Sequence, residues 1–316
     1  MPPVASHASL SDRFLGCLLG SAVGDGLGSP WEGLTSFDIY QLGGPAHVLV
    51  TNPTGDTLYY TDDTEMTVSV AETLVEHGEI QGESLIRAFA RNYHPDRGYG
   101  RGARRIIEAV ATGGDWNAIA ETVFPGGSLG NGAAMRVAPV GVFFHDDFDR
   151  VWEQARLSAF PTHRHPVGIE AAQVMALAVA LATRAESISR KAVLSELLRR
   201  STTEEMTRAL RTALSLRRGD SIGVLGSTLE AHRSVVTAIA AFAASPGDFE
   251  AAVGNVIALG DDTDTLAAMA GALCGAFGGI AAIPAALVEK LENDALGRDH
   301  IRSLAIRLDE TFTSRR

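Results

Sequence analysis

Two dense groups of Asp and Thr stand out in the sequence, each placed directly before a helical pattern of apolar residues. The first group is Thr61-Asp62-Asp63-Thr64, and the second, Asp-Asp-Thr-Asp-Thr, covers residues 261–265 near the other end of the chain. Asp and Thr are good N-caps, and negative charge is favourable at the start of a helix. A helix uses only about one such side chain for capping, so each group contains more acid than capping requires.

If the fold brings the two groups together, they form an all-oxygen metal site. The candidate ligands are the carboxylates of Asp62, Asp63, Asp262 and Asp264 and the hydroxyls of Thr61 and Thr265. Hard oxygen ligands select Mg²⁺, Mn²⁺ or Ca²⁺, and the lack of clustered Cys or His argues against zinc. Two divalent ions that share a bridging Asp would hold so many carboxylates ionised. The structural alternative is simple capping of two separate helices.

The elements that position these groups are predicted to be helices, so the expected fold class is all-α. Apolar residues recur with a period of 3.6, whereas alternating strand patterns do not occur. Amphipathic helices are predicted over residues 64–77, 84–93, 148–160, 166–185, 189–200, 203–217 and 299–314, and central apolar helices within 132–143, 167–182, 234–244 and 265–277. Thr202 and Glu205 have the spacing of a capping box. The Gly-rich segments 20–30, 124–135 and 221–231 are predicted to interrupt the helical packing.

Composition limits the classes of protein to consider. We expect a disordered tail over residues 1–11 and one compact domain over residues 12–316, because no linker or low-complexity run divides the chain. The net charge of −11 argues against a nucleic-acid or anionic-membrane surface. Segment 266–288 has the length of a membrane span, but Gly and Pro interrupt it. Cys17 and Cys274 are expected to be buried free thiols in a cytoplasmic protein.

Six ordered sequence blocks resemble the ADP-ribosylglycohydrolases, a family that includes dinitrogenase-reductase-activating enzymes and ADP-ribosyl-acceptor hydrolases. The blocks are GCLLGSAVGDGLGSPWE (16–32), LYYTDDTEM (58–66), DRGYGRG (96–102), GGSLGNGAAMRVAPVG (126–141), RLSAFPTHRHPVG (156–168) and ALGDDTDTLAAMAGALCGAF (258–277). The motifs LYYTDDT and PDRGYG, with the Glu after the first block, are most similar to the branch that degrades poly(ADP-ribose) and releases ADP-ribose from serine. The arginine-directed branch is the rival. The resemblance implies an all-α domain with metals in a central cleft.

The resemblance also implies a role for each matched residue. The metal ligands would be Thr61, Asp62, Asp63, Asp262, Asp264 and Thr265, holding two divalent cations, Mg²⁺ or Mn²⁺. Glu32 would be the catalytic acid/base, with Asp62 or Asp63 as the second choice. ADP-ribose would contact Asp62, Gly126, Gly127, Ser128, Leu129, Gly130, Asn131, Gly132, His163 and Leu229. Asp261 matches a position that is often Gly and is left out of the ligands. Leu129 replaces an aromatic that stacks on adenine in relatives, and Phe124 is a possible substitute.

The reaction implied is metal-dependent hydrolysis of the bond at ribose C1″, which releases ADP-ribose from serine and acts on poly(ADP-ribose). The expected partners are ADP-ribosylated proteins and ADP-ribose, without nucleic acid or membrane, and a monomer is slightly favoured. Three alternatives stay open: an ADP-ribosyl-arginine hydrolase, a two-metal nucleotide phosphoesterase, and a non-catalytic ADP-ribose-binding protein.

Overall fold

The computed structural model describes residues 8–315, and within this range the regular elements are helices joined by loops and three isolated β-bridges. The α-helices are α1 (Leu10–Gly28), α2 (Ser36–Gly43), α3 (Ala46–Thr51), α4 (Asp62–His77), α5 (Gly82–Asn92), α6 (Arg101–Ala111), α7 (Trp116–Val123), α8 (Ala138–Phe143), α9 (Phe148–Ala159), α10 (Pro166–Arg184), α11 (Arg190–Arg200), α12 (Glu204–Ser215), α13 (Ala231–Ala244), α14 (Phe249–Ile257), α15 (Thr263–Gly278), α16 (Ala285–Lys290) and α17 (Arg298–Ser314). The short 3₁₀ helices are η1 (Ser29–Trp31), η2 (Asn131–Ala133), η3 (Ile222–Leu225) and η4 (Ile280–Ala282). The predicted all-α fold class is confirmed.

α1 begins at Leu10, before the end of the N-terminal tail that the sequence predicts. Ser9 is the N-cap of α1 and forms a capping box with Asp12, so residues 9–11 belong to this helix and its cap. The prediction of a disordered tail over residues 1–11 is therefore wrong for residues 9–11. Residues 1–7 lie outside the described residues.

The predicted capping box of Thr202 and Glu205 is also wrong. α12 starts at Glu204 with Thr203 as its N-cap, and no side chain caps its backbone. The hydroxyls of Thr202 and Thr203 instead donate to the carboxylate of Glu170 on α10. The start of a helix offers only N–H donors, whereas the Glu170 carboxylate accepts strong hydrogen bonds from both hydroxyls and from the amides of Thr202 and Thr203, so the tertiary contact prevails over the local motif.

The Gly-rich segment 20–30 is not the predicted interruption, because α1 continues to Gly28. Gly occupies every fourth position of α1 from residue 16 to residue 28, which places the four glycines on one face. A Cβ on Gly24 would lie 2.1 Å from the carbonyl oxygen of Ala267, and one on Gly20 would lie 2.4 Å from that of Gly271. The backbones of α1 and α15 are therefore in direct contact, and only Gly fits on this face.

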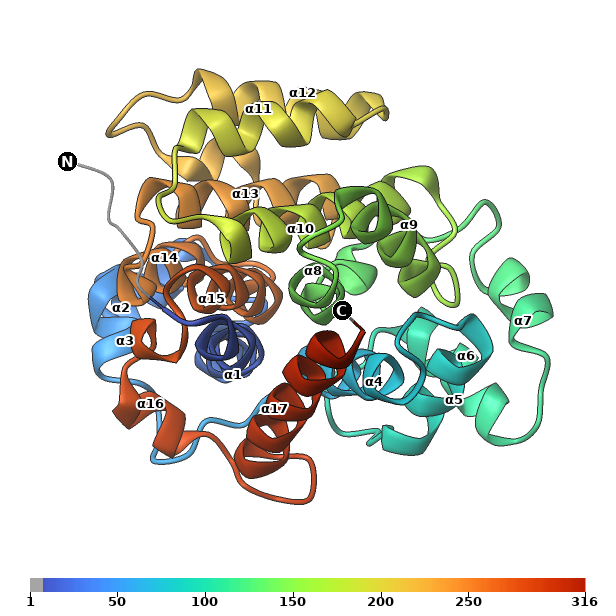
Figure 1. Ribbon diagram of the computed structural model, residues 1–316. Helices are drawn as coiled ribbons and strands as arrows, with labels where there is room; N and C mark the ends of the chain where they lie inside the picture. The colour runs from blue at the N-terminus through green and yellow to red at the C-terminus, as the bar shows by residue number, and fades with distance from the viewer. Residues whose placement is uncertain (1–7, 316) are drawn as a thin grey trace.

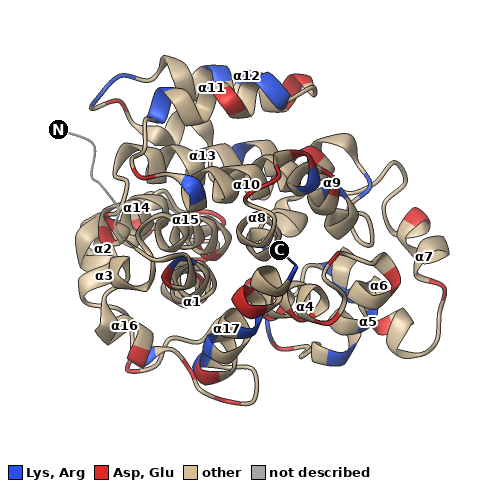
Figure 2. Ribbon diagram, in the orientation of Figure 1, with Lys and Arg blue, Asp and Glu red and all other residues tan. Residues whose placement is uncertain are grey.

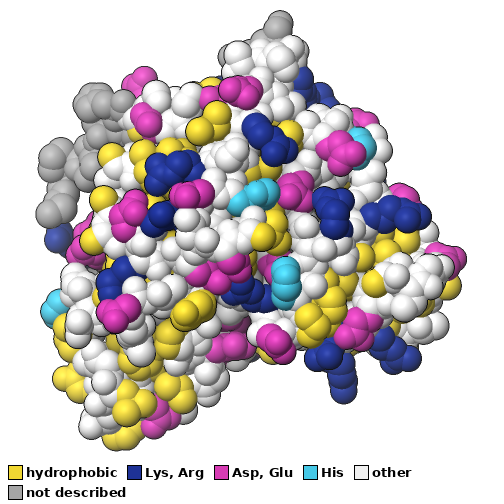
Figure 3. Space-filling view, turned by 90° about the horizontal axis from the view of Figure 1, so that it is seen from below, with side chains coloured by type: hydrophobic (Ala, Val, Ile, Leu, Met, Phe, Trp, Pro, Cys, Tyr) yellow, Lys and Arg dark blue, Asp and Glu magenta, His cyan; other side chains and the backbone are white. Residues whose placement is uncertain are grey.

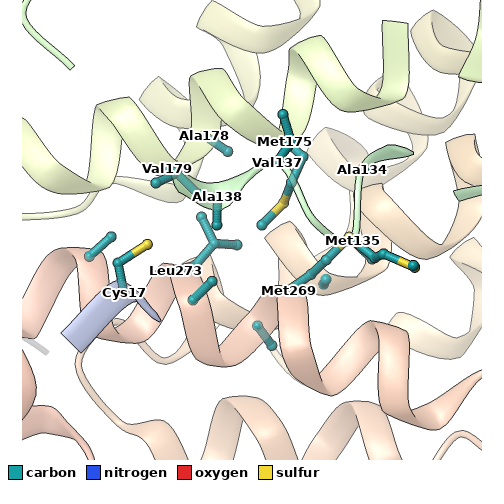
Figure 4. Packing of buried hydrophobic residues seen from close by; sticks show 14 of the residues in the cluster. Cys17, Ala134, Met135, Val137, Ala138, Met175, Ala178, Val179, Met269 and Leu273 are labelled. Carbon is teal, nitrogen blue, oxygen red and sulfur yellow. The ribbon is translucent and has the colours of Figure 1, made fainter. Parts of the chain in front are cut away.

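α1 and α15 occupy the centre of the molecule, with α10 and α13 above them and α11 and α12 as an outer layer (Figure 1). α4 to α6 lie on the opposite side from α2 and α3 (Figure 1). Figure 4 shows the core between α10 and α15, where Met175 and Val179 face Met269 and Leu273, all of them buried. The segments predicted to be apolar helices within 167–182 and 265–277 thus lie in α10 and α15, at the core. Cys17 and Cys274 are buried free thiols, as expected.

In the described part of the chain, α10 is the one helix with the length and hydropathy of a membrane span. Of its apolar window, 83% is buried inside the protein, as in the core helix of a globular domain. The apolar segment 266–288, considered as a span in the sequence, is divided here between α15, η4 and α16.

Charged residues of both signs are distributed over the outer helices (Figure 2). On the face seen in Figure 3, Lys and Arg alternate with Asp and Glu, and hydrophobic side chains lie between them. This face has no extended basic area of the kind that binds a nucleic-acid backbone.

Candidate active site

The fold places the two acidic groups side by side at the starts of α4 and α15. Thr61 is the N-cap of α4, and Asp262 occupies the N-cap position of α15. The two groups are joined directly, because Thr265 Oγ1 donates to Asp63 Oδ2 over 3.3 Å. All six candidate metal ligands are buried, each with at most 9% of its surface exposed. The structure thus brings together Thr61, Asp62, Asp63, Asp262, Asp264 and Thr265.

Helix capping does not account for these side chains. Within the first acidic group only Thr61 caps α4, accepting a hydrogen bond from Asp63 N, and Asp262 makes no side-chain bond to the start of α15. Asp63 Oδ1 is buried and has no hydrogen-bond partner. A buried carboxylate oxygen without a partner is costly, so its position needs another explanation.

Asp25 is a further acidic residue of this site that the sequence pattern did not single out. It lies on α1, is fully buried, and accepts hydrogen bonds from the amides and hydroxyls of both Thr61 and Thr64 at 2.6 to 3.0 Å. It was missed because its Gly-rich surroundings were interpreted as a loop. An acidic residue on the Gly-bearing helix was the available signal, since a buried carboxylate requires nearby donors.

The carboxylates are crowded, and within residues 8–315 no Lys or Arg forms an ion pair with them. Burial, followed by the negative charge of Asp264, raises the pKa of Asp25 to about 7. Burial and then Asp262 raise the pKa of Asp264 to about 7. Burial and then Asp264 raise the pKa of both Asp62 and Asp63 well above the usual range. A bound divalent cation would remove this electrostatic penalty, which is the property expected of a metal site.

Glu32 lies at the mouth of the site, immediately after η1. Carboxylate oxygens of Glu32, Asp262 and Asp264 lie within 4.8 Å of one another, although Glu32 is more than two hundred residues away from the other two in the sequence. The Glu32 side chain is solvent-accessible, yet desolvation by the surrounding protein and then the charge of Asp264 raise its pKa. An acid with these properties suits proton transfer at the edge of a cleft.

The loop that carries Glu32 is fastened to the second acidic group. Gly33 N donates to Asp261 O over 2.7 Å, and Asp261 N donates to Leu34 O over 2.9 Å. Asp261 has φ of 64°, the one positive φ of a non-Gly residue within 8–315, which explains why Gly also suits this position. Its carboxylate accepts from Ser227 Oγ over 2.7 Å.

A cavity of about 360 Å³ extends from the carboxylates. Part of its wall is formed by residues from segment 126–132, the ligand loop, which the sequence predicts to contact ADP-ribose. The predicted residues that line it are Glu32, Asp62, Asp63, Ser128, Gly130, Asn131, Gly132, His163, Leu229, Asp262, Asp264 and Thr265. Thr61, Gly126, Gly127 and Leu129 are absent from its lining. Gly127 has a structural role, because a Cβ there would lie 2.1 Å from His165 N.

Phe124 lines the cavity, whereas Leu129 faces outward with 42% of its surface exposed. The ring of Phe124 packs on Gly102 at the start of α6, where a Cβ would lie 2.1 Å from the ring. The ring of Phe124, the residue considered in the sequence as a substitute for Leu129, therefore provides an aromatic wall in this region of the cavity.

Asn131 connects the ligand loop to the acidic groups. Its side-chain amide donates to Asp262 Oδ2 and, over 3.0 Å, to Ser234 Oγ. The Asn131 backbone amide donates to Leu229 O, and Ala231 N donates to Leu129 O. These bonds hold Leu229 beside the ligand loop at the start of α13.

Arg136, which the sequence analysis did not single out, lies at the floor of the cavity and is fully buried. It donates to Gly132 O, Ser158 O and Thr162 Oγ1, and its Nε has no acceptor. No carboxylate pairs with it among the ion pairs of residues 8–315, and burial lowers its pKa to about 9. A charged residue within an apolar segment was the available signal.

Comparisons with known proteins agree on one family. The profile described as ADP-ribosylglycohydrolase matches residues 6–316. ADP-ribosylhydrolase ARH3 of Homo sapiens is 32% identical over 347 residues, covering 95% of this chain and 93% of its own. The ARH3 of Danio rerio is 31% identical over 351 residues, covering 98% and 93%. A solved structure described as an ADP-ribosylglycohydrolase-related protein complex superposes with a TM-score of 0.73 at 29% identity, covering 96% of this chain and 98% of the other.

Proposed function

This chain belongs to the ADP-ribosylglycohydrolase family and is a glycosidase of ADP-ribose linkages, and from that premise we propose that it releases ADP-ribose from serine. We include the ribose–ribose bond of poly(ADP-ribose) among its substrates. One observation carries the proposal: three carboxylates from two distant segments converge within 4.8 Å at one end of a cavity. The motifs LYYTDDT and PDRGYG and the position of Glu32 support the serine-directed branch.

The acidic site fits two divalent ions, Mg²⁺ or Mn²⁺. Thr61, Asp62, Asp63, Asp262, Asp264 and Thr265 would hold them, and the partnerless Asp63 Oδ1 is the observation that supports this fit. When bound, such ions orient the ribose hydroxyls and stabilise the charge that develops during cleavage.

Glu32 is the proposed acid/base residue. Cleavage of a glycosidic bond passes through an oxocarbenium-like state and needs a group that exchanges a proton with the leaving atom or the attacking water. Glu32 lies at the open end of the acidic site with a raised pKa, as this role requires. Asp62 and Asp63 are second choices, because a carboxylate that holds a metal is a weaker base.

The rest of the cavity would hold the ADP-ribose. Ser128, Gly130, Asn131 and Gly132 line it beside the acidic site. The amides of Gly130 and Asn131 donate to Ser128 Oγ and Leu229 O, so the diphosphate would bind through the remaining amides of this loop, since backbone amides bind phosphate oxygens well. Phe124 provides a surface on which adenine can stack. Leu229, which is 65% exposed, borders both this cavity and a neighbouring one that also contains Glu32.

The experiment is a product assay on matched substrates. The protein is incubated, with Mg²⁺, Mn²⁺ or EDTA, with one peptide ADP-ribosylated on serine, the same peptide modified on arginine, and poly(ADP-ribose). Free ADP-ribose released from the seryl peptide only with metal is the expected result. Preferential release from arginine would replace the branch assignment. AMP or phosphate as product would indicate a two-metal phosphoesterase, and binding without any product would indicate a reader of ADP-ribose.

A further inference from the structure

A chain of three polar side chains runs from the floor of the cavity to its wall. Arg136 Nη2 lies 2.7 Å from Thr162 Oγ1, which in turn lies 2.8 Å from His163 Nδ1. All three residues are buried, with 0%, 5% and 7% of their surfaces exposed. Arg136 and Thr162 have no assigned role in the site described above, beyond the contacts that hold them.

The chemistry of the three groups favours one direction for the two hydrogen bonds. A guanidinium only donates, so Thr162 Oγ1 is the acceptor in its bond with Arg136. Within residues 8–315, His163 Nδ1 is the one other polar atom within hydrogen-bond distance of this hydroxyl. The hydroxyl proton therefore has Nδ1 as its one available acceptor, and the arrangement that satisfies this buried donor leaves Nδ1 unprotonated. A neutral imidazole then carries its proton on Nε2.

The environment keeps the ring neutral. Burial lowers the pKa of His163 to about 3, and the positive charge of Arg136 acts in the same direction. A second proton on this ring would also remove the acceptor that the Thr162 hydroxyl needs.

The Nε2 edge of the ring faces the ligand loop across two glycines. A Cβ on Gly132 would lie 3.0 Å from His163 Cε1 and 3.3 Å from Nε2, and one on Gly130 would lie 3.8 Å from Nε2. Within the described chain, Nε2 has no protein acceptor, and His163 lines the cavity. The N–H group is thus available to a ligand that lies along the loop from Ser128 to Gly132.

We propose that Arg136 and Thr162 are positioning residues that hold His163 as the Nε2–H tautomer, so that it donates one hydrogen bond to a ligand oxygen and transfers no proton. The identity of the ligand rests on the proposed function, under which the acceptor is an oxygen of the ADP-ribose diphosphate. The tautomer itself does not depend on that function.

The first test is the tautomer in the protein without nucleotide. Protein with ¹⁵N-labelled histidine is studied by long-range ¹H–¹⁵N correlation, and the signals of His163 are identified by their loss in His163→Gln. We expect an unprotonated Nδ1 and a protonated Nε2 at pH 7. An Nδ1–H ring, an even mixture or an imidazolium would overturn the proposal, whatever ligand the cavity binds.

The second test separates the Thr162 hydroxyl from the general effect of removing a buried hydroxyl. Thr162→Val should lose the single tautomer and bind ADP-ribose about tenfold more weakly, the value of roughly one hydrogen bond. Thr162→Ser should restore both. The matched control is Thr183→Val, because Thr183 is buried on α10, donates to Val179 O, and does not line the cavity.

The outcomes distinguish this inference from the proposed function. Wild-type binding by Thr162→Val, or a defect in Thr162→Ser as large as in Thr162→Val, would contradict the positioning role. If wild-type protein shows the Nε2–H tautomer but does not bind ADP-ribose, the assignment of the ligand fails while the tautomer assignment stands. If Thr162→Val does not fold, the wild-type spectrum still decides.

Discussion

At the scale of single residues, Glu32 gives the sharpest prediction. Glu32→Gln removes the exchangeable proton and keeps the shape, so turnover should fall by at least about 100-fold. ADP-ribose binding and the metal-dependent rise in Tm should remain, because the six metal ligands are unchanged. Steady-state kinetics, calorimetry and thermal melting measure the three quantities.

The matched control for Glu32 is Glu230→Gln. Glu230 lines the neighbouring cavity but not the main one, and its carboxylate pairs with Arg233 at 2.7 Å. Turnover close to wild type is expected for this variant. If Glu32→Gln retained near-normal turnover, Glu32 would lose its assigned role.

Asp62 and Asp264 test whether the two acidic groups form one metal site. Asp62→Ala or Asp264→Ala should abolish hydrolysis and remove most of the Tm increase that Mg²⁺ or Mn²⁺ produces, because a ligand that binds only the folded state stabilises it. Zinc should not replace these ions productively, given oxygen ligands alone. The measurement is thermal melting with and without each metal.

The control for the acidic site is Asp261→Asn. Asn tolerates the positive φ of this position and keeps an acceptor for Ser227, so only the charge is lost. The metal-dependent Tm increase should be preserved. A full increase in Asp62→Ala or Asp264→Ala would mean that the two groups bind no common metal.

Phe124 and Leu129 test how adenine is held. Phe124→Ala should weaken ADP-ribose binding about tenfold, if about 1.4 kcal/mol of stacking is lost. Leu129→Ala should change it little, since Leu129 is absent from the cavity lining. Calorimetric titration measures both. Because Leu129 replaces an aromatic residue of relatives, Leu129→Tyr would tighten binding if adenine lay beside it. Tighter binding by Leu129→Tyr together with unchanged binding by Phe124→Ala would place adenine on the outer face of the loop.

At the scale of elements, the contact between α1 and α15 sets the geometry of the site. Gly24→Ala would place a Cβ 2.1 Å from the Ala267 carbonyl oxygen and force the helices apart. We expect a loss of about 1 to 3 kcal/mol or more in the free energy of unfolding, measured by urea denaturation. The metal-dependent Tm increase should also shrink, because α1 carries Asp25 and α15 carries Asp264.

Gly82→Ala is the matched control for this substitution. Gly82 is the first residue of α5, and a Cβ there would make ordinary contact with Trp116 at 3.7 Å. Stability should stay the same or increase slightly, because Ala favours a helix more than Gly does. An equal loss in the two variants would show that the effect at Gly24 is not due to close helix packing.

The periodic helices were predictable from the sequence, and the elements dense in glycine were not. α4, α10 and α17 match their predicted ranges to within two residues, because amphipathic or uniformly apolar patterns determine their burial. The second half of α1 was interpreted as a loop, since Gly disfavours a helix unless a partner helix lies within contact distance. That partner is more than two hundred residues away in the sequence. The two acidic groups were predictable because each directly precedes a clear helical pattern. Asp25 was not, because it lies in the Gly-rich half of α1, and Arg136 was not, because it lies within an apolar segment.

At the scale of the whole molecule, the buried carboxylates couple stability, pH and metal. The pKa values of Asp25 and Asp264 are raised to about 7, while an unfolded Asp titrates near 3.9. The metal-free folded state therefore binds more protons than the unfolded state between these values. Its free energy of unfolding should be greatest below about pH 4 from this source and should fall as pH rises through about 7.

Metal binding should oppose this loss, because protons and cations compete for the same oxygens. The Tm increase with Mg²⁺ should thus be larger at pH 8 than at pH 5.5, as measured by melting in EDTA and in saturating metal. A larger increase at the lower pH would contradict a site built from these carboxylates.

The fastening of the Glu32 loop limits how far its carboxylate can reach. Before Glu32 in the chain, Trp31 is buried, and Glu32 N donates a hydrogen bond to Ser29 O. After it, the backbones of Gly33 and Leu34 are hydrogen-bonded to the backbone of Asp261. The backbone cannot slide to bring a shorter side chain forward, so the length of the side chain alone sets the distance to the bond that breaks. Glu32→Asp, which withdraws the carboxylate by about 1.5 Å, should therefore be nearly as inactive as Glu32→Gln although it keeps the acid.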